Sequence, residues 1–172
     1  TANTGVVYHH GKLLVLKEDS PPVVVDPDSL DTVDDYYTFG GQLRSLTFTA
    51  HPKIDSETGE LVAFGYEARG EATDDVAVMS FDTRGHLTWE AWIKVPYVGL
   101  LHDFAVTQTH VAFLLIPMAT NVERMRQGQV HFAWDSRLPT WFGVLRRGGD
   151  GSDVRWFKGP ERCATHTMGT FS

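Results

Sequence analysis

Short runs of β-branched and aromatic residues, separated by turns rich in Asp and Gly, are the feature that most limits how this chain can fold. Three turn signals stand at residues 26–28 (DPD), 55–59 (DSETG) and 82–85 (DTRG), each between apolar runs of strand length. Turns of this kind join antiparallel neighbours, so the pattern predicts hairpins. Residues 121–127 (NVERMRQ) favour a turn or two of helix, but no longer helical period competes. The sequence therefore predicts an all-β fold.

The predicted strands fall into groups of four. They cover residues 5–9, 12–18, 23–26, 34–38, 45–50, 60–67, 75–81, 87–95, 101–107, 110–116, 143–145 and 154–157. Four antiparallel strands recurring about every 50 residues are typical of β-propeller blades, and a sandwich fits them less well. We expect residues 1–172 to form a partial β-propeller of about three blades. These blades lie at about 4–39, 45–95 and 101–157, with the start of another at 163–172.

Charge and apolar content exclude several classes of partner. Fifteen Lys and Arg against 22 Asp and Glu leave a formal net charge of −7 without a basic cluster, so no nucleic acid is expected. The longest apolar stretch, residues 111–119, has about half of the ~20 residues that a membrane-spanning helix requires, and it predicts a buried strand. Cys163 is the one cysteine of the chain, which excludes an internal disulfide and fits a reducing, cytoplasmic location. We expect it to be a small buried residue, and the oligomeric state stays open.

Three histidines occupy equivalent places in the repeat. His51 opens the second unit, His102 opens the third 51 residues later, and His166 follows 64 residues after that, the extra length matching an insertion around residues 121–140. The first strand of every propeller blade lines the central channel, so equivalent positions face one axis. We therefore expect the three imidazoles to converge. Neutral imidazoles without cysteine or a repeated carboxylate suit a divalent first-row metal such as iron, copper or zinc.

Each histidine also has a simpler interpretation. A single histidine near a strand end is more often a hydrogen-bonded structural residue than a ligand, and the shared register is what favours a metal site. The remaining histidines show no such register and are expected to be exposed or structural: His9, His10, His86, His110 and His131. Asp103, which follows His102, is expected to point away from the axis because strand neighbours alternate faces.

Several longer segments resemble one known family, the carotenoid cleavage oxygenases. The resemblance runs over nearly the whole chain and is most specific in AHPKID and HDFAVT, which contain His51 and His102, and it continues through WDSRLPTWFGVLRR and CATHTMGTFS. It implies a seven-bladed propeller with one Fe(II) on its axis, held by four histidines from four blades. It also implies cleavage of a carbon–carbon double bond by O2 into two carbonyl products. By position, His51, His102 and His166 match the first three ligands.

The same resemblance implies that the sequence is an internal piece of a longer protein. The chain begins TANTG, without an initiator Met or a leader, and the fourth ligand of the family lies far toward the C-terminus. A piece with three of four ligands is expected to be inactive by itself. One departure concerns the third histidine, which the family often follows with Asn and then Glu. This chain has Gly169 and Ser172 there, which leaves the local support of His166 open.

Lys17 points to one branch of the family. Carotenoid-cleaving members commonly have an aromatic residue in the segment that corresponds to VLKED, whereas this chain resembles lignostilbene dioxygenases in having Lys17. The resemblance implies that this lysine contacts the 4-hydroxyl of a phenolic stilbene. An ammonium beside a phenol stabilises phenolate, whose charge delocalises onto the alkene and makes it more reactive. By periodicity alone Lys17 does not differ from Lys12, and a solvated surface lysine is the simpler interpretation.

Taken with the resemblance, the sequence predicts a non-haem Fe(II) dioxygenase. Its expected partners are O2 and a small phenolic or isoprenoid alkene, and the expected reaction cleaves the central double bond of a phenolic stilbene or phenylpropanoid to give two aldehydes. Lys17 is the expected catalytic residue, with His51, His102 and His166 as metal ligands. Two alternatives remain: an apocarotenoid-cleaving dioxygenase, and a propeller scaffold that binds partners without catalysis.

Overall fold

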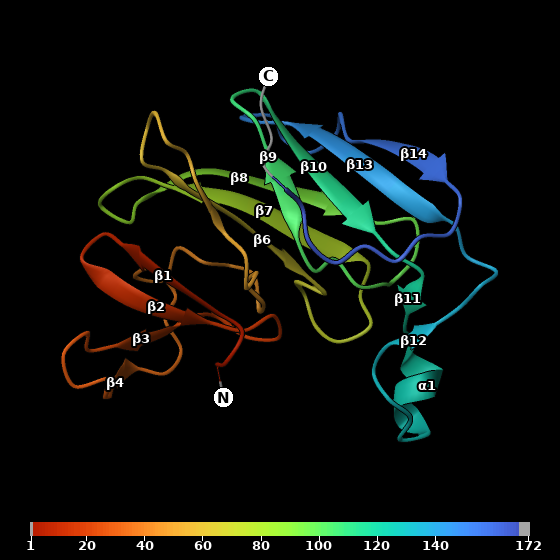
Figure 1. The fold of residues 1–172 in the computed structure, drawn as a ribbon, viewed down its shortest axis with the longest axis horizontal. Helices are drawn as coiled ribbons and strands as arrows, with labels where there is room; N and C mark the ends of the chain where they lie inside the picture. Colours follow the sequence, from red (N-terminus) through yellow and green to blue (C-terminus); the bar gives the residue numbers. More distant parts are fainter. Residues whose placement is uncertain (1, 169–172) are drawn as a thin grey trace.

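Three four-stranded antiparallel sheets make up most of the computed structural model, which describes residues 2–168 (Figure 1). The first sheet has the order β1 (Gly5–His9), β2 (Lys12–Leu16), β3 (Val23–Val25) and β4 (Thr32–Asp34). The second has β5 (Lys53–Ile54), β6 (Leu61–Tyr66), β7 (Asp75–Phe81) and β8 (Leu87–Lys94). The third has the order β14 (Arg155–Gly159), β13 (Thr140–Arg146), β10 (His110–Leu115) and β9 (Phe104–Val106). The predicted all-β fold of antiparallel four-stranded sheets is confirmed.

A small insertion separates β10 from β13. It contains β11 (Met118–Ala119), which pairs with β12 (Ala133–Trp134), and α1 (Val122–Arg126) between them. The side chain of Asn121 caps the helix by accepting the N–H of Arg124, and the insertion extends away from the three sheets in Figure 1. The short helix predicted at 121–127 is therefore confirmed. Among the described residues, no helix combines the length and apolar character needed to cross a membrane.

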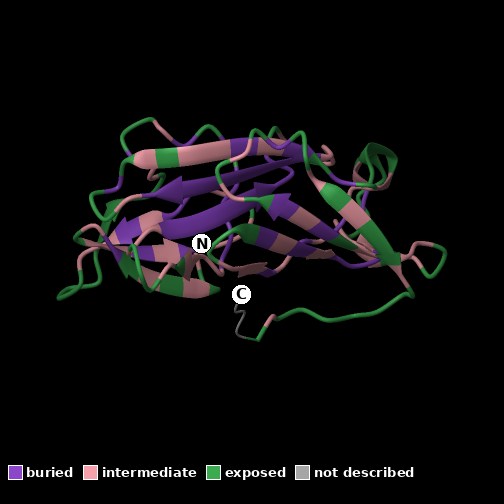
Figure 2. Ribbon diagram, turned by 90° about the horizontal axis from the view of Figure 1, so that it is seen from above, coloured by how far each residue is buried: buried purple, intermediate pink, exposed green. Residues whose placement is uncertain are grey.

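The second sheet lies between two hydrophobic cores and belongs to both. Its inner strands, β6 and β7, are buried along their whole length, seen as the purple arrows at the centre of Figure 2. Because successive side chains on a strand point to opposite faces, neighbouring residues enter different cores. Val62 and Phe64 pack with the third sheet, in the cluster that contains Phe104 and Phe113. On the other face, Ala63 packs in the cluster that contains Leu14 and Leu16 of the first sheet. Full burial of each large apolar side chain in such a cluster contributes about 1.5–3 kcal/mol to stability.

The strand predicted at residues 45–50 is wrong, because this segment runs beside β6 without forming a ladder. Its isolated backbone bonds run from the N–H of Leu46 to Ala68 and from the N–H of Thr49 to Phe64. It approaches so closely that a Cβ added to Gly65 would lie 2.3 Å from the carbonyl oxygen of Thr47. The hydroxyl of Thr47 donates to the carbonyl of Tyr66, and its N–H donates to the hydroxyl of Ser45. Side-chain hydroxyls thus satisfy backbone groups that a regular strand would pair. His51 follows directly from this buried segment.

The strand predicted at residues 34–38 is also misplaced. The strand in this region, β4, ends at Asp34, whose carboxylate accepts the N–H of Tyr36 and turns the chain. The first two sheets fall within the ranges predicted for blades, and the third extends two residues beyond its range, to Gly159. The division of the chain into blades stays a prediction, and residues 169–172 of the predicted next blade lie outside the described residues.

Two histidines form a hydrogen-bonded pair at the turn between β1 and β2. Nδ1 of His9 lies 2.9 Å from Nδ1 of His10, and Nε2 of His10 lies 2.8 Å from the hydroxyl of Tyr37. Burial lowers the pKa of both imidazoles, that of His10 to about 4. The neighbouring charges of His9 and Lys12 lower the pKa of His10 further, and Asp82 only partly opposes them. Both rings are therefore neutral at neutral pH, as expected for structural histidines.

We expect the free energy of unfolding of the full-length protein to fall as the pH decreases from about 6.5 toward 4. The unfolded chain binds protons at the ordinary histidine pKa of about 6.5, whereas the folded state resists them until the lower pKa is reached. His10→Asn should reduce this dependence, because Asn tolerates the left-handed backbone that His10 adopts (φ 39°). Urea unfolding at several pH values measures the effect, with His110→Gln on the surface as the control. Equal pH dependence in all three proteins would contradict the prediction.

Candidate metal centre

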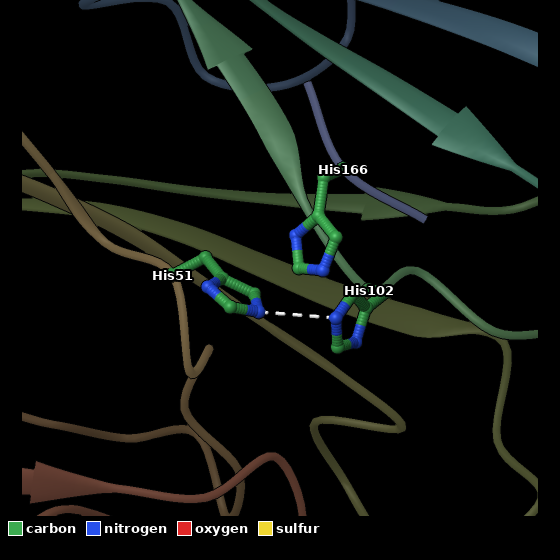
Figure 3. A group of neighbouring side chains, drawn as sticks. All are labelled: His51, His102 and His166. Atoms are coloured by element: carbon green, nitrogen blue, oxygen red, sulfur yellow. Dashed lines mark hydrogen bonds between the residues drawn. The ribbon is translucent and has the colours of Figure 1, made fainter. Parts of the chain in front are cut away.

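The structure brings the three predicted histidines together from three separate segments. His51 stands just before β5, His102 just before β9, and His166 in an irregular segment that follows β14. Their rings point toward one another in Figure 3, with centroids 4.6 Å apart for His51 and His102 and 4.9 Å apart for the other two pairs. The register of the repeat predicted this convergence, although none of the three lies within a strand.

The nitrogen atoms are spaced as one metal ion would need them. Nε2 of His51 lies 3.0 Å from Nε2 of His102, and one nitrogen from each of the three rings lies within 4.8 Å of the others. Imidazole nitrogens bind a first-row divalent metal at about 2.0–2.1 Å, so two of them on one ion stand roughly 3 Å apart. The donor set therefore fits a divalent metal. Whether the three residues bind it stays a prediction.

Glu18 lies behind His102 and was not found from the sequence. Its Oε1 is buried and lies 2.6 Å from Nδ1 of His102, a charge contact that lacks the alignment of a hydrogen bond. The hydroxyl of Tyr66 donates to Oε2 at 3.1 Å, and burial raises the pKa of this tyrosine so that it keeps its proton. A proton on Nδ1 beside this carboxylate would leave Nε2 of His102 with its lone pair toward the centre of the group. Glu18 follows β2 of the first sheet, so no short motif links it to His102.

Burial shifts the pKa of two groups at the centre, His51 and Glu18. Burial lowers the pKa of His51, the neighbouring His102 lowers it further, and Asp103 only partly opposes them. His51 is therefore neutral at neutral pH, which is the form that binds metals. Burial raises the pKa of Glu18, an effect that its contacts with His102 and Tyr66 only partly offset.

Replacing Glu18 with Gln in the full-length protein is expected to weaken metal binding about 10-fold. Glutamine keeps an acceptor for Nδ1–H of His102 but loses the negative charge that makes the imidazole a better donor. Titration of Co(II) into the metal-free protein measures the dissociation constant. Asp19→Asn changes the adjacent, more exposed carboxylate and should leave the constant unchanged. Equal affinity in the two variants would show that the charge of Glu18 is not used.

Asp103 is buried beside the three histidines. Its side chain is 4% exposed, and Oδ1 accepts the ammonium of Lys53 at 2.6 Å and the N–H of Phe104 at 2.8 Å. Oδ2 accepts the N–H of Thr167 at 2.8 Å and lies 2.9 Å from its hydroxyl. None of these bonds goes to an imidazole of the centre, in agreement with the prediction. One of them does reach the segment that carries His166.

The segment around His166 differs from its prediction in one respect. Cys163, expected to be a small buried residue, is exposed. The reason is that residues 160–168 leave β14 and run along the surface without joining a sheet. The two residues on which this chain departs from the family pattern, Gly169 and Ser172, lie outside the described residues.

Lys17 lies on the wall of a cavity of about 560 Å³ beside the metal centre. Its ammonium is 2.7 Å from Oδ2 of the exposed Asp19, and one third of its side chain is accessible. The same cavity is lined by Glu18, whose carboxylate contacts His102, so Glu18 connects the cavity to the histidine cluster. Lys12, which periodicity could not distinguish from Lys17, instead lies 5.6 Å from the ring of Tyr37.

A histidine and a carboxylate that the sequence did not single out also line this cavity. Nε2 of His131, on the insertion, lies 2.9 and 3.0 Å from the two carboxylate oxygens of Glu67, at the end of β6. Glu67 also accepts the N–H of Ala72, and its own backbone is left-handed (φ 50°). This contact connects the insertion to the end of the second sheet at the wall of the cavity. It agrees with the structural role expected for His131.

Comparison with known proteins gives consistent matches over the whole chain. The profile of the family described as retinal pigment epithelial membrane protein matches residues 1–172. The chain is 51% identical to carotenoid cleavage oxygenase 1 of Neurospora crassa and 48% identical to resveratrol cleavage oxygenase 1 of Aspergillus fumigatus, each over 172 residues. These matches cover 99% of this chain and 32% and 34% of the relatives. The crystal structure of lignostilbene dioxygenase from Pseudomonas brassicacearum matches with a TM-score of 0.90 and 49% identity, over 94% of this chain and 33% of that one. The chain thus spans about a third of the length of these relatives.

Proposed function

The chain belongs to the retinal pigment epithelial membrane protein family, that of the carotenoid cleavage oxygenases, and on that premise we propose that its protein cleaves an alkene with O2. The reaction we propose adds both atoms of O2 across the central double bond of a phenolic stilbene or phenylpropanoid, and two aldehydes leave. The names of two relatives, resveratrol cleavage oxygenase and lignostilbene dioxygenase, support a phenolic stilbene as the substrate class.

One observation supports this function above the others: imidazole nitrogens of His51, His102 and His166 lie within 4.8 Å of one another. We propose that they hold Fe(II) together with a ligand from elsewhere in the protein. A set of neutral imidazoles leaves the ion its full charge and leaves positions open, and bound Fe(II) supplies the electrons that activate O2. The protein prepares two of these ligands for the metal. Burial keeps His51 neutral, and Glu18 orients His102.

The cavity beside the centre is suited to a small, flat phenol. Its volume of about 560 Å³ lies in the range of small-molecule sites, and Phe132 and Leu46 supply apolar wall. We propose that Lys17 meets the phenolic hydroxyl of the substrate there. Its ammonium would lower the pKa of that phenol and hold the phenolate, and the exposed Asp19 is a weak competitor for it.

The test uses the full-length protein and begins with its metal content. Purified protein is expected to contain about one iron per chain and to convert a 4-hydroxystilbene into two aldehydes only when O2 is present. Chelation should abolish the reaction, and added Fe(II) should restore it. Bound iron without aldehyde formation from any alkene would favour the non-catalytic scaffold. A protein that lacks iron and does not bind it would contradict the proposal.

An apocarotenoid is the second candidate substrate, because one close relative is named a carotenoid cleavage oxygenase. Parallel assays with a 4-hydroxystilbene and an apocarotenoid separate the two possibilities. Cleavage of the apocarotenoid alone would replace the stilbene in the proposal and would leave the metal site as it stands.

A further inference from the structure

We propose that Asp103 is a positioning residue, which holds the segment of His166 so that the third imidazole meets the other two before a metal binds. This inference rests on the proposed function, because it concerns the same metal centre. Its basis is a partly buried polar network, centred on the buried Asp103, that lies beside the three histidines and connects the three segments that carry them.

The network takes one residue from beside each histidine. Lys53 stands two residues after His51, and Asp103 and Thr167 directly follow the other two histidines. The carboxylate of Asp103 is bonded to both partners: Oδ1 accepts from the ammonium of Lys53 at 2.6 Å, and Oδ2 accepts from the backbone N–H of Thr167 at 2.8 Å. The hydroxyl of Thr167 lies 2.9 Å from Oδ2 and 2.9 Å from the carbonyl oxygen of Phe104, and it can donate to either. One carboxylate therefore joins three segments that are distant in sequence.

The segment of His166 needs such a contact more than the other two do. His51 follows a buried segment and His102 precedes β9, whereas residues 160–168 join no sheet and are almost entirely exposed. In Figure 2 this stretch is the long, mostly green loop that runs toward the C label. Within it, the structure gives two places of attachment. One is Arg162, whose backbone bonds with the hydroxyl of Thr140, and the other is Thr167 with Asp103.

The second attachment determines where the imidazole lies. Arg162 is four residues before His166, whereas Thr167 is the adjacent residue, so fixing its N–H fixes the backbone from which the ring projects. Asp103 is itself fixed, since it is 5% exposed and both oxygens are bonded. Its burial opposes ionisation, but the bonds from Lys53, Thr167 and Phe104 outweigh this and keep its pKa below the usual range.

The inference is tested with Asp103→Asn and Thr167→Ala in the full-length protein. Asparagine has a single acceptor oxygen, so it cannot serve both Lys53 and the N–H of Thr167. Co(II) titrated into the metal-free protein and followed by its visible absorption is expected to bind about 10- to 100-fold more weakly to Asp103→Asn. Thr167→Ala should lose a smaller factor, and Thr167→Ser, which keeps the hydroxyl, should restore wild-type affinity.

A measurement without metal separates positioning from activity. In the metal-free protein, hydrogen exchange of the Thr167 amide is expected to be slow in the wild type and faster in Asp103→Asn. The matched control is Asp55→Asn, because Asp55 forms another buried ion pair, at 2.7 Å with Arg147, between the second and third sheets. That control should lower stability yet leave the Co(II) affinity and the Thr167 amide as in the wild type.

The outcomes can be told apart. Wild-type Co(II) affinity in Asp103→Asn, with or without faster exchange, would overturn the positioning role and leave the proposed function intact. Wild-type Co(II) affinity in His102→Ala would instead overturn the proposed metal centre. If Asp103→Asn does not fold, the Thr167→Ala and Thr167→Ser pair carries the test alone, and equal affinity in these two variants overturns the inference.

Discussion

Replacing His102 with alanine in the full-length protein is expected to abolish bound iron and O2-dependent aldehyde formation together. Nε2 of His102 lies 3.0 Å from Nε2 of His51, and Nδ1 of His102 lies 2.6 Å from the carboxylate of Glu18. Loss of a group that only supports a ligand costs 10- to 100-fold in metal affinity, so loss of a ligand should cost more than about 100-fold. The cavity left by the ring also exposes the buried carboxylate of Glu18 to water.

Metal analysis and the aldehyde assay measure this effect on the same preparation. His110→Ala is the matched control, because His110 is an exposed histidine at the start of β10, eight residues along the chain. It should keep both iron and activity. An iron content in His102→Ala equal to that of the control would refute the ligand role, whatever happens to activity.

Replacing Lys17 with alanine is expected to reduce turnover of a 4-hydroxystilbene roughly 100-fold while iron stays bound. The removed ammonium is a single preorganised group that stabilises negative charge on the substrate, and loss of one such group typically costs 100- to 1,000-fold in rate. The side chain lines the cavity and makes no contact with His51, His102 or His166. The change should therefore appear in turnover and not in metal content.

Lys12 provides the control for this prediction, since it begins β2, the strand that Lys17 directly follows, but packs over Tyr37 outside the cavity. Lys12→Ala should leave turnover unchanged. A 4-methoxystilbene, which cannot ionise, should react slowly with the wild type and lose little further rate in Lys17→Ala. If the lysine variant cleaves the 4-hydroxystilbene at the wild-type rate, the phenolic interpretation of Lys17 fails.

The sequence predicted the convergence of the histidines because the repeat itself encodes it. Equal spacing places His51 and His102 at the same point of successive sheets, and the strands at 5–9 and 75–81 were predicted with their observed ends. The strand at 45–50 was not, because this segment lies so close to Gly65 that a hydroxyl bond from Thr47 replaces part of the ladder. Such a close approach depends on the tertiary fold and leaves no local pattern.

Supporting residues were harder to predict than the histidines. Glu18 reaches His102 from another sheet, and Thr167 reaches Asp103 across 64 residues. Asp103 was predicted to face away from the imidazoles, and its carboxylate bonds to other groups, although it lies just before β9 and not within a strand. The sequence could not indicate that a surface segment folds back onto that buried carboxylate, because contacts of this range are set by how the sheets stack.

The shared position of the second sheet has a consequence for altering this protein. Adjacent residues on β6 pack in different interfaces between sheets: Val62 and Phe64 contact one neighbouring sheet, while Leu61 and Ala63 contact the other. A designer could therefore repack either interface separately by varying only odd or only even positions of this strand. Conversely, a one-residue slip of that strand would exchange the side chains that fill the two interfaces. We therefore expect the register of β6 to tolerate change less than most features of the chain.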